Sequence, residues 1–529
     1  MNKVSADLIT ETHYGIQMLN YRTRPRSLHS LLQSVAGRFP RKNAFECNAE
    51  EMTYEQFSSD VDRLAAAMQQ TLGVKKGDRV ALLVGNSLAF PLTLFASARI
   101  GAVSVPINKR FVASEIAFIL DNAGASVVVV HADYWNECSR AMRSAAGVRH
   151  VVMAGSLEAD SDCIELGTLL KESPGKPDEI DVDEKDLASI FYTAGTMGKP
   201  KGAMCTHRNF IANSMNVEAV TGITPDDRGL ICVPLSHPTG CQSQLIAGVF
   251  VGATSVIQSH FNADEALALI GKARITTMVG VPTIYWLMLA QMNLRNYDLG
   301  SLKNIIYGGA PASPELVRRL REAFPSVRLG NGYGLAESSS LATFLPDEYS
   351  IEKPNSVGPP VPTLEMRVVD EDGRKVATGK IGEVLLKGPN VVDGYWQDPA
   401  GTREIFADGW LATGDLGRID DEGFLYIVDR KKDLIIRGGE NIYSVEIQNV
   451  LQSHPHVFEA AVVGEPDKVF GEQVKAYIVS NPGHSLSVDE ILDFCDQHLA
   501  DFKIPKYVEF VKELPRNPAG KVDKRALRR

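Results

Sequence analysis

Short apolar runs alternate with longer amphipathic stretches along the N-terminal part of the chain. Residues 79–84, 103–107 and 127–130 are short, mostly apolar runs, broken only by Arg79 and Ser104, typical of strands that are buried on both faces of a sheet. Residues 53–72 instead place their apolar side chains at helical spacing. Because strands that alternate with helices usually pair in parallel, the pattern predicts a layered α/β sheet.

A second unit of the same kind follows. Strands are predicted at residues 230–234 and 277–281, and a helix is predicted at residues 208–219. Ser313 and Pro314 predict the start of a further helix, because Ser is a favoured N-cap and Pro is favoured at the first helical position.

The pattern changes near residue 354 to short strands separated by Asp/Gly turns, which predicts a β-rich subdomain. A charged run, residues 429–433, then precedes a last unit of mixed strands and helices. We therefore predict an α/β fold with a large N-terminal domain, residues 1–430, of layered α/β subdomains plus the β-rich subdomain. A small α+β C-terminal domain, residues 431–529, is predicted to follow, with the charged run as its hinge.

The composition is that of a soluble globular protein, with 44% hydrophobic and 23% charged residues. A net charge of −10 argues against nucleic acid or an anionic membrane as the main partner. Asp7 and Glu11 interrupt the N-terminus, and Arg99 and two prolines interrupt the apolar stretch 88–107. Seven scattered cysteines without a C-x-x-C pair indicate reduced thiols. These features predict a cytoplasmic protein without a signal peptide or a membrane-spanning segment.

Residues 191–202 concentrate glycines, threonines and lysines directly after a predicted strand at residues 187–191. Glycine allows backbone N–H groups to converge on an anion, and Lys199 and Lys201 add positive charge for a phosphate. The loop is not a Walker A motif, because Thr193 occupies the position of that motif's first glycine. A solvated turn is the alternative to a phosphate site.

This loop resembles the signature loop of the adenylate-forming superfamily, which includes acyl-CoA synthetases, adenylation domains and luciferase-like enzymes. In that family the loop closes over the phosphates of ATP. The resemblance implies that the loop binds ATP through Thr193, Gly195, Thr196, Gly198 and Lys201.

Two further motifs resemble walls of that family's substrate site. His237, in a Pro-Leu-Ser-His sequence, matches the histidine that lines the acyl pocket, although a lone histidine is more often structural. Gly309, Ala310 and Pro311 match the segment beside the adenine and the acyl group. Small residues at the end of a strand let a flat ring approach the backbone, and a plain strand-to-helix turn is the alternative.

Asn331-Gly332-Tyr333-Gly334, followed by Glu337, is the most informative further match. A tyrosine between glycines can stack on a base, and a carboxylate can hold Mg²⁺ beside phosphates. By resemblance, Tyr333 stacks on adenine, Asn331 contacts the edge of the base, and Glu337 is the metal ligand.

Asp415, Arg430 and Lys432 match three family positions near the predicted domain boundary. A carboxylate can accept two hydrogen bonds from a ribose diol, and the resemblance assigns that role to Asp415. It also implies that Arg430 reaches the nucleotide and that a mobile C-terminal domain turns about Lys432. Taken alone, residues 429–433 would be a solvated surface run.

Two C-terminal motifs complete the resemblance. Gly438, Gly439 and Glu440 match the loop that swings in to line the pantetheine tunnel of coenzyme A. Lys521, preceded by Gly520, matches the mobile catalytic lysine that bridges the carboxylate and the α-phosphate during adenylation. A lysine in such a tail is otherwise usually just solvated.

Three positions depart from the family pattern. Ala194, Met197 and Ala336 stand where the family usually has Ser, Ser or Thr, and Thr. Each departure removes a hydroxyl near the phosphates, and a hydrogen bond to a charged group contributes about 1.5–3 kcal/mol. We expect altered handling of ATP with activity retained, because Thr193 and the backbone N–H groups remain.

The resemblance implies an AMP-forming acid–thiol ligase that uses ATP, Mg²⁺ and coenzyme A. A carboxylic acid, ATP and CoA would give acyl-CoA, AMP and pyrophosphate through an acyl-adenylate, with Lys521, Glu337 and His237 as catalytic residues. We expect a fatty or bulky apolar acid, with an aryl acid as the alternative. Polar neighbours of His237, such as Ser236 and Thr239, make that wall more polar than a fatty-acid tunnel needs.

Other functions share these motifs. A stand-alone adenylation enzyme would load a carrier protein, a luciferase-like oxygenase would consume O₂, and a nucleotide-binding sensor would not catalyse adenylation. The sequence shows no carrier domain, which favours CoA as the acceptor. We expect a monomer or homodimer that binds no nucleic acid and does not insert stably into a membrane.

Overall fold

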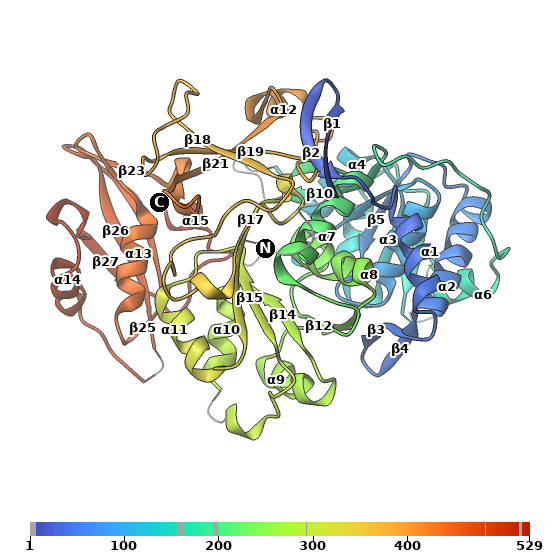
Figure 1. Ribbon diagram of the computed structural model, residues 1–529, viewed down its shortest axis with the longest axis horizontal. Helices are drawn as coiled ribbons and strands as arrows, with labels where there is room; N and C mark the ends of the chain where they lie inside the picture. Colours follow the sequence, from blue (N-terminus) through green and yellow to red (C-terminus); the bar gives the residue numbers. More distant parts are fainter. Residues whose placement is uncertain are drawn as a thin grey trace.

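Two largely parallel sheets form the centre of the protein (Figure 1). The computed structural model describes residues 7–155, 163–193, 199–291, 294–481, 483–517 and 521–528. The strands of the first sheet lie in the order β11 (Lys201–Thr206), β10 (Leu187–Thr193), β6 (Val103–Pro106), β5 (Arg79–Leu83), β7 (Ala125–His131), β8 (His150–Ala154) and β9 (Ile164–Glu165). These strands pair in parallel, except that β11 is antiparallel to β10.

The second sheet is also parallel except at its two edges. Its strands lie in the order β17 (Thr343–Leu345), β16 (Arg328–Tyr333), β15 (Asn304–Gly308), β14 (Thr277–Gly280), β12 (Arg228–Ile231), β13 (Thr254–Ile257), β3 (Asn43–Cys47) and β4 (Glu50–Thr53). The edge strands β17 and β4 are antiparallel to their neighbours. Since the inner strands are parallel, the loops that follow them emerge at one common edge of the sheet.

Helices form three layers around these two sheets. The middle layer, packed between the sheets in one apolar core, contains α1 (Leu28–Arg38), α2 (Tyr54–Ala66), α3 (Ala89–Arg99), α6 (Leu166–Lys171), α7 (His207–Thr221), α8 (Ala247–Val251) and a π-helical segment, Thr239–Ile246. The outer face of the first sheet is covered by α4 (Ala113–Ala123) and α5 (Trp135–Met142). The outer face of the second sheet is covered by α9 (Ala263–Lys272), α10 (Pro282–Leu289) and α11 (Pro314–Ala323).

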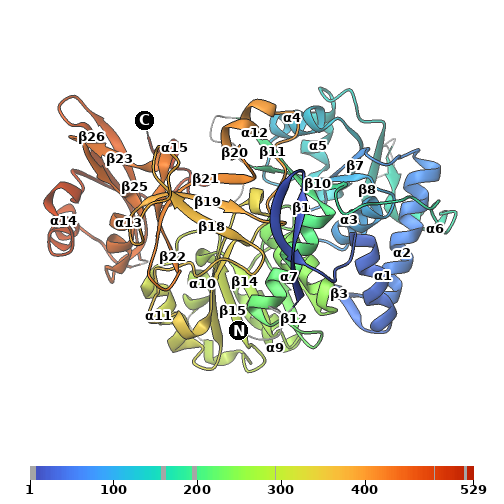
Figure 2. The same ribbon diagram turned by 45° about the horizontal axis from the view of Figure 1, so that its top comes forward.

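A β-rich unit sits across the two sheets. It contains β18 (Glu365–Val369), β19 (Gly382–Lys387), β20 (Phe406–Ala407), β21 (Trp410–Ile419), β22 (Leu425–Arg430) and the short helix α12 (Pro399–Ile405). An N-terminal hairpin of β1 (Leu8–His13) and β2 (Ile16–Tyr21) lies between this unit and α7 (Figure 2). The hairpin contacts both, because the Tyr21 hydroxyl donates to Asn216 of α7 and Ile16 packs close to Gly409.

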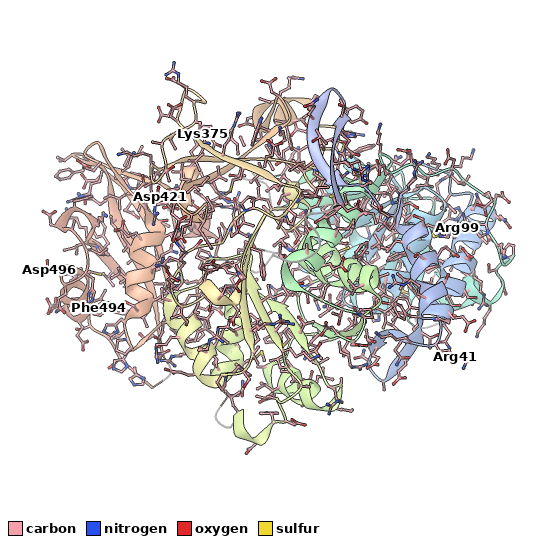
Figure 3. The ribbon with its side chains drawn as sticks, viewed as in Figure 1. Arg41, Arg99, Lys375, Asp421, Phe494 and Asp496 are labelled. Carbon is pink, nitrogen blue, oxygen red and sulfur yellow. The ribbon has the colours of Figure 1, made fainter. Side chains whose placement is uncertain are left out.

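The C-terminal part lies at one end of the long axis. It contains β23 (Ile435–Arg437), β24 (Glu440–Ile442), β25 (Val457–Asp467), β26 (Gly471–Ser480), β27 (Tyr507–Phe510), α13 (Ser444–Ser453), α14 (Val488–Asp496) and α15 (Lys524–Leu527). Figure 3 shows Phe494 and Asp496 of α14 at the left edge of the molecule and Arg41 at the opposite side.

One buried polar contact joins this C-terminal part to the β-rich unit. The Asp429 carboxylate at the end of β22 accepts hydrogen bonds from the backbone N–H and the hydroxyl of Ser444, the first residue of α13. Lys524 Nζ donates to the same hydroxyl at 2.7 Å. Burial raises the pKa of Asp429 and lowers the pKa of Lys524. An anion at a helix N-terminus is favourable, so this contact helps to fix the C-terminal part in the observed position.

The predicted fold class is confirmed, and most predicted elements lie within a few residues of the observed ones. Two differ in detail. The helix predicted at residues 53–72 ends as an α-helix at Ala66 and continues as a π-helical turn to Thr71. The strand predicted at residues 230–234 begins earlier and ends at Ile231. The predicted boundary at residue 430 stays a prediction.

The structure also bears on the state of the cysteines and on the long apolar stretch of the sequence. Every cysteine of the chain is a free thiol in the structure, as the scattered spacing predicts. Within the described residues, no helix has the length and apolar character needed to cross a membrane. The apolar stretch 88–107 forms α3 and β6 in the core.

Candidate active site

A continuous cavity of about 1010 Å³ opens where the common edge of the second sheet meets the β-rich unit and the C-terminal part. The loops after β12, β15 and β16 supply His237, Gly309 and Glu337 to its wall. Lys201 of β11 and Lys521 near the chain end also line it. The fold therefore brings residues from widely separated motifs to a single space.

The predicted site residues that line this cavity come from most of the motifs: Thr193, Lys201, His237, Gly309, Gly332, Gly334, Glu337, Arg430, Lys432 and Lys521. Glycine is required at Gly334 and at a further lining residue, Gly308. A Cβ on Gly334 would lie 1.6 Å from the Ser340 carbonyl oxygen, and a Cβ on Gly308 would lie 2.1 Å from the Gly332 carbonyl oxygen. The chain can pack its backbone this closely only without side chains.

Asp415 and Tyr333 do not themselves line the cavity: Asp415 is buried beside the lining residues Gly414 and Arg430, where two hydrogen bonds hold it. The Tyr333 hydroxyl donates to its Oδ2 at 2.6 Å, and Arg430 Nε donates to its Oδ1 at 3.0 Å. Burial and the Asp415 charge raise the pKa of Tyr333 well above its usual value. The neighbouring Asp415 charge also raises the pKa of Arg430. Asp415 is therefore surrounded by donors that keep their protons.

Glu337 is oriented by a tyrosine from another loop. The Tyr395 hydroxyl donates to Glu337 Oε1 at 2.5 Å. Tyr395 is itself fixed because its loop pairs with β11: the Met204 N–H donates to the Gly394 carbonyl, and the Trp396 N–H donates to the Gly202 carbonyl. The same tyrosine ring lies 5.0 Å from Lys201 Nζ, so one side chain positions both an anionic and a cationic group of the cavity.

The glycine-rich loop is described only at its two ends. Thr193 ends β10, Lys201 begins β11, and the Thr193 hydroxyl donates to the Lys201 carbonyl at 3.4 Å. Lys201 Nζ lies 3.8 Å from an Asp398 oxygen. The predicted contacts Gly195, Thr196 and Gly198, and the departures Ala194 and Met197, lie outside the described residues.

Lys521 reaches into the mouth of the cavity from the C-terminal part. Hydrogen bonds with Asn517 hold its backbone: the Lys521 N–H donates to the Asn517 side-chain oxygen at 3.1 Å, and the Asn517 N–H donates to the Lys521 carbonyl. Burial and, after it, the nearby Arg430 charge lower the pKa of Lys521 to about 8. Asp415 and Glu337 act on this pKa in the opposite direction. The lysine therefore lies among the charged groups at the mouth and can lose its proton near neutral pH.

His237 is a neutral residue in this setting. Burial lowers the pKa of His237 to about 3, and repulsion from the Lys521 charge acts in the same direction. The backbone N–H of Thr239 donates to its Nδ1 at 3.2 Å, which fixes that nitrogen as an acceptor. A neutral imidazole in this wall can contact an acyl group, and its Nε2–H can donate a hydrogen bond.

Several predicted site residues lie away from the cavity. Asn331 is buried, and its amide donates to the Ser356 carbonyl at 3.1 Å. Ala310 and Pro311 are exposed in the turn after β15. Gly438, Gly439 and Glu440 form the exposed turn between β23 and β24. The roles predicted for these residues stay predictions.

The sequence did not reveal two residues that shape this site. Tyr395 and Asn517 both line the cavity; Tyr395 lies in a segment without a recognisable chemical pattern, and Asn517 lies in the lysine motif, where only Lys521 was assigned a role. Their partners, Glu337 and Lys521, were the residues that the motifs singled out. Only the fold shows which side chains hold them.

Comparison with known proteins decides the family. The family described as AMP-binding enzyme matches residues 32–396, and the family described as AMP-binding enzyme C-terminal domain matches residues 446–521. The chain belongs to the AMP-binding enzyme family. It is an AMP-forming acid–CoA ligase that works through an acyl-adenylate, and ATP and CoA are its substrates.

Relatives of the ligase act on different acids. A feruloyl-CoA synthase of Amycolatopsis sp is 36% identical over 490 residues, which cover 93% of this chain and 96% of that protein. A long-chain-fatty-acid–CoA ligase of Salmonella typhimurium is 34% identical, with 96% and 94% covered. A crystal structure of an anthranilate CoA ligase with anthranoyl-AMP superposes with a TM-score of 0.89 at 27% identity, covering 96% of this chain and 97% of that one.

Proposed function

We propose that this ligase activates a fatty or bulky apolar carboxylic acid, with an aryl acid as the second candidate. The observation that carries the proposal is the continuity of the cavity: the space that holds Lys521, Glu337 and His237 at its mouth extends between α7 and the second sheet. Apolar side chains line that extension: Val217, Ile223, Ile231, Val279, Ile306, Leu341 and Phe344. Burial of an apolar body there removes apolar surface from water.

The first half-reaction must overcome the poor reactivity of a carboxylate, whose leaving group would be oxide. A carboxylate oxygen attacks the α-phosphorus of ATP, and pyrophosphate leaves. We propose that Lys521 binds the acid and the α-phosphate as an ammonium ion, because a fixed positive charge in a buried site stabilises the charge of the transition state. Thr193 and Lys201, at the ends of the glycine-rich loop, would contact the outgoing phosphates.

The nucleotide would bind beside the Tyr333–Asp415–Arg430 cluster. Each Asp415 oxygen accepts one protein hydrogen bond and keeps acceptor capacity for a ribose hydroxyl. Gly332 and Gly334 line the cavity here with their backbone, so a flat base can stack against the main chain. The proposed adenine and ribose roles therefore fit the side chains beside the mouth.

Glu337 fits a Mg²⁺ ligand. Its carboxylate lines the cavity, and the Tyr395 hydrogen bond occupies only Oε1, so hard oxygen ligation remains available. Among the described residues there is no cluster of three or more His, Cys, Asp or Glu side chains that could hold a metal alone. A single carboxylate suits Mg²⁺, which usually takes its other ligands from substrate phosphates and water. When bound, Mg²⁺ would neutralise phosphate charge.

The second half-reaction requires a different C-terminal position. We propose that residues 431–529 turn about Lys432, which withdraws Lys521 and brings Gly438, Gly439 and Glu440 to the cavity. The CoA sulfur then attacks the acyl carbonyl and AMP leaves. The exposed turn at Gly438 and Gly439 has positive φ at both glycines, a conformation that favours glycine.

A panel of fatty and aryl acids, each with ATP and either CoA or a carrier protein, tests the proposal. We expect AMP release and acyl-CoA formation with at least one elongated acid and free CoA. Transfer only to a carrier protein would contradict CoA as the acceptor. If none of the acids supports ATP–pyrophosphate exchange, the proposed catalysis is contradicted. We further propose a cytoplasmic monomer or homodimer.

A further inference from the structure

The extension of the cavity runs along the strands of the second sheet. Its lining begins at Gly308 and Gly309, at the carboxyl ends of the strands, and continues to Thr277, which pairs with Asn304. Asn304 lies four residues before Gly308, so at about 3.3 Å per residue this slot is about 13 Å deep. A slot of that depth accepts an elongated acid body.

The walls of the slot are kept open by small residues. Gly229 lies on β12, and Gly248 of α8 packs directly against Ser255 of β13 in the wall of the slot. A Cβ on Gly248 would come within 3.1 Å of the Ser255 hydroxyl. Both glycines lie in the far half of the slot, so the far half is as much a part of the binding space as the mouth.

Polar groups surround the far end of this otherwise apolar slot. The hydroxyl residues there are Thr221, Thr254, Ser255 and Thr277, and the buried Asp227 lies beside them. Two of these hydroxyls are committed to the backbone: Thr221 donates to the Val217 carbonyl at 2.7 Å, and Thr254 donates to the Asn43 carbonyl at 2.6 Å. A slot for a plain alkyl chain has no need of such groups, because buried polar atoms are costly unless they are paired.

Three lining residues carry buried polar atoms with no hydrogen-bond partner among the described residues. These atoms are Thr277 Oγ1, Gln244 Nε2 and the Tyr307 hydroxyl, and Tyr307 directly precedes Gly308 at the other end of the slot from Thr277. Gln244 lies in the π-helical segment Thr239–Ile246, and such segments are frequent at functional sites. Because an unpaired buried donor is unfavourable, a polar group on the bound acid is the natural partner for these atoms.

The negative charge of Asp227 at the far end limits which polar group the bound acid can carry there. Asp227 lines the cavity there, and it accepts hydrogen bonds from the Thr276 hydroxyl at 2.7 Å and from the Thr224 N–H at 2.8 Å. Among the described residues, the lysines and arginines that line the cavity all lie at its mouth. Lys42, behind the floor, does not line the slot and donates to the carbonyls of Pro225 and Gly252.

We propose that the acid is elongated and carries a neutral hydroxyl at the end remote from its carboxylate. This inference rests on the acid-activating function proposed above. The hydroxyl accepts or donates a hydrogen bond at Thr277, while the apolar body fills the slot. A second carboxylate is excluded, because it would lie near Asp227 without a lining cation to pair with it.

Matched acids test this inference. One set is a linear acid of about 13 Å with a terminal methyl group, its ω-hydroxy analogue and its ω-carboxy analogue; the other is cinnamate with its para-hydroxy analogue. The measurement is kcat/KM for AMP release with CoA present. We expect the hydroxylated acid of at least one set to exceed its unsubstituted partner by about tenfold. The ω-carboxy acid should be the poorest of its set.

Two variants connect this preference to the far end of the slot. Thr277→Val removes an unpartnered hydroxyl with little change of shape, and it should reduce the hydroxyl-to-methyl preference about tenfold. Thr221→Val is the matched control: it removes a hydroxyl that is already bonded to the backbone, and it should leave the preference unchanged.

The outcomes separate this inference from the proposed function. Equal or better activity with unsubstituted acids, a preference for the ω-carboxy acid, or an unchanged preference in Thr277→Val would overturn the hydroxyl assignment while the ligase function stands. Failure of every acid in the wild-type protein would overturn the proposed function itself. If Thr277→Val does not fold, the wild-type comparison of matched acids still decides.

Discussion

Replacing Lys521 should damage only the first half-reaction. Lys521→Ala removes the positive charge that reaches the cavity mouth from the C-terminal part. A hydrogen bond to a charged group contributes about 1.5–3 kcal/mol. At about 1.4 kcal/mol per factor of ten, adenylation should slow by about 10- to 150-fold. Thioester formation from a supplied acyl-adenylate and CoA should stay near the wild-type rate, because Lys521 is withdrawn in that step.

The pH dependence of adenylation tests the role of Lys521 independently. Burial lowers the pKa of Lys521 to about 8, so the side chain is protonated below that pH and loses its charge above it. The value of kcat/KM for ATP in adenylation reports groups of the free enzyme. It should therefore fall about tenfold per pH unit above pH 8. Lys521→Arg should remove this decline, because a guanidinium keeps its charge across that range.

The assay is ATP–pyrophosphate exchange at a fixed acid concentration, measured from neutral to alkaline pH for the wild type and both variants. A stopped assay of thioester formation from synthetic acyl-adenylate supplies the control. Equal losses in both half-reactions for Lys521→Ala would refute the idea of a mobile lysine. A wild-type profile that is flat through pH 8 would refute the assignment of the titrating group to Lys521.

Other residues at or beside the mouth give narrower predictions. Tyr395→Phe should raise the Mg²⁺ concentration needed for half-maximal pyrophosphate exchange by about tenfold, since it removes the hydroxyl that orients Glu337; an unchanged Mg²⁺ titration would count against that role. Asp415→Ala should weaken ATP binding by about tenfold or more, measured by calorimetry, and an unchanged affinity would disprove the ribose assignment. Ala336→Thr should tighten ATP binding or speed pyrophosphate release by restoring a hydroxyl at the cavity wall. A large loss would instead mean that packing requires the small residue.

The strands of the core could be predicted from the sequence because a strand that is buried on both faces consists mainly of apolar residues. The run at residues 79–84 is apolar since both faces of β5 pack against helices, and the observed strand, Arg79–Leu83, agrees within a residue. Likewise, Ser313 and Pro314 fix the start of α11 by capping chemistry that operates within one turn.

The partners of the functional groups could not be predicted in the same way. The hydrogen bond from Tyr395 to Glu337 joins segments 58 residues apart, and no pattern in either segment predicts that the two side chains meet. The contact between Asp429 and Ser444 depends on where the C-terminal part docks, which local patterns do not encode. The motifs identified Asp415 as an acceptor, but the two donors that already surround it follow only from the packing of β16, β21 and β22.

The π-helical segment Thr239–Ile246 also escaped prediction. Its residues read as a polar loop after His237, and no local signal marks the wider turn. That turn places Gln244 on the wall of the slot. The polarity of this wall was noted from the sequence, but its depth and the small residues that keep it open were visible only in three dimensions.

The most direct test of the central claim follows the oxygen atoms of the acid. The ligase should be given an acid labelled with ¹⁸O in its carboxylate, together with ATP and CoA, and the AMP and pyrophosphate should be analysed by mass spectrometry. If the acid attacks the α-phosphorus and the thiol then displaces AMP, one labelled oxygen from each acid appears in AMP and none appears in pyrophosphate. Label in a phosphate product other than AMP, or unlabelled AMP alongside acyl-CoA, would contradict an acyl-adenylate pathway.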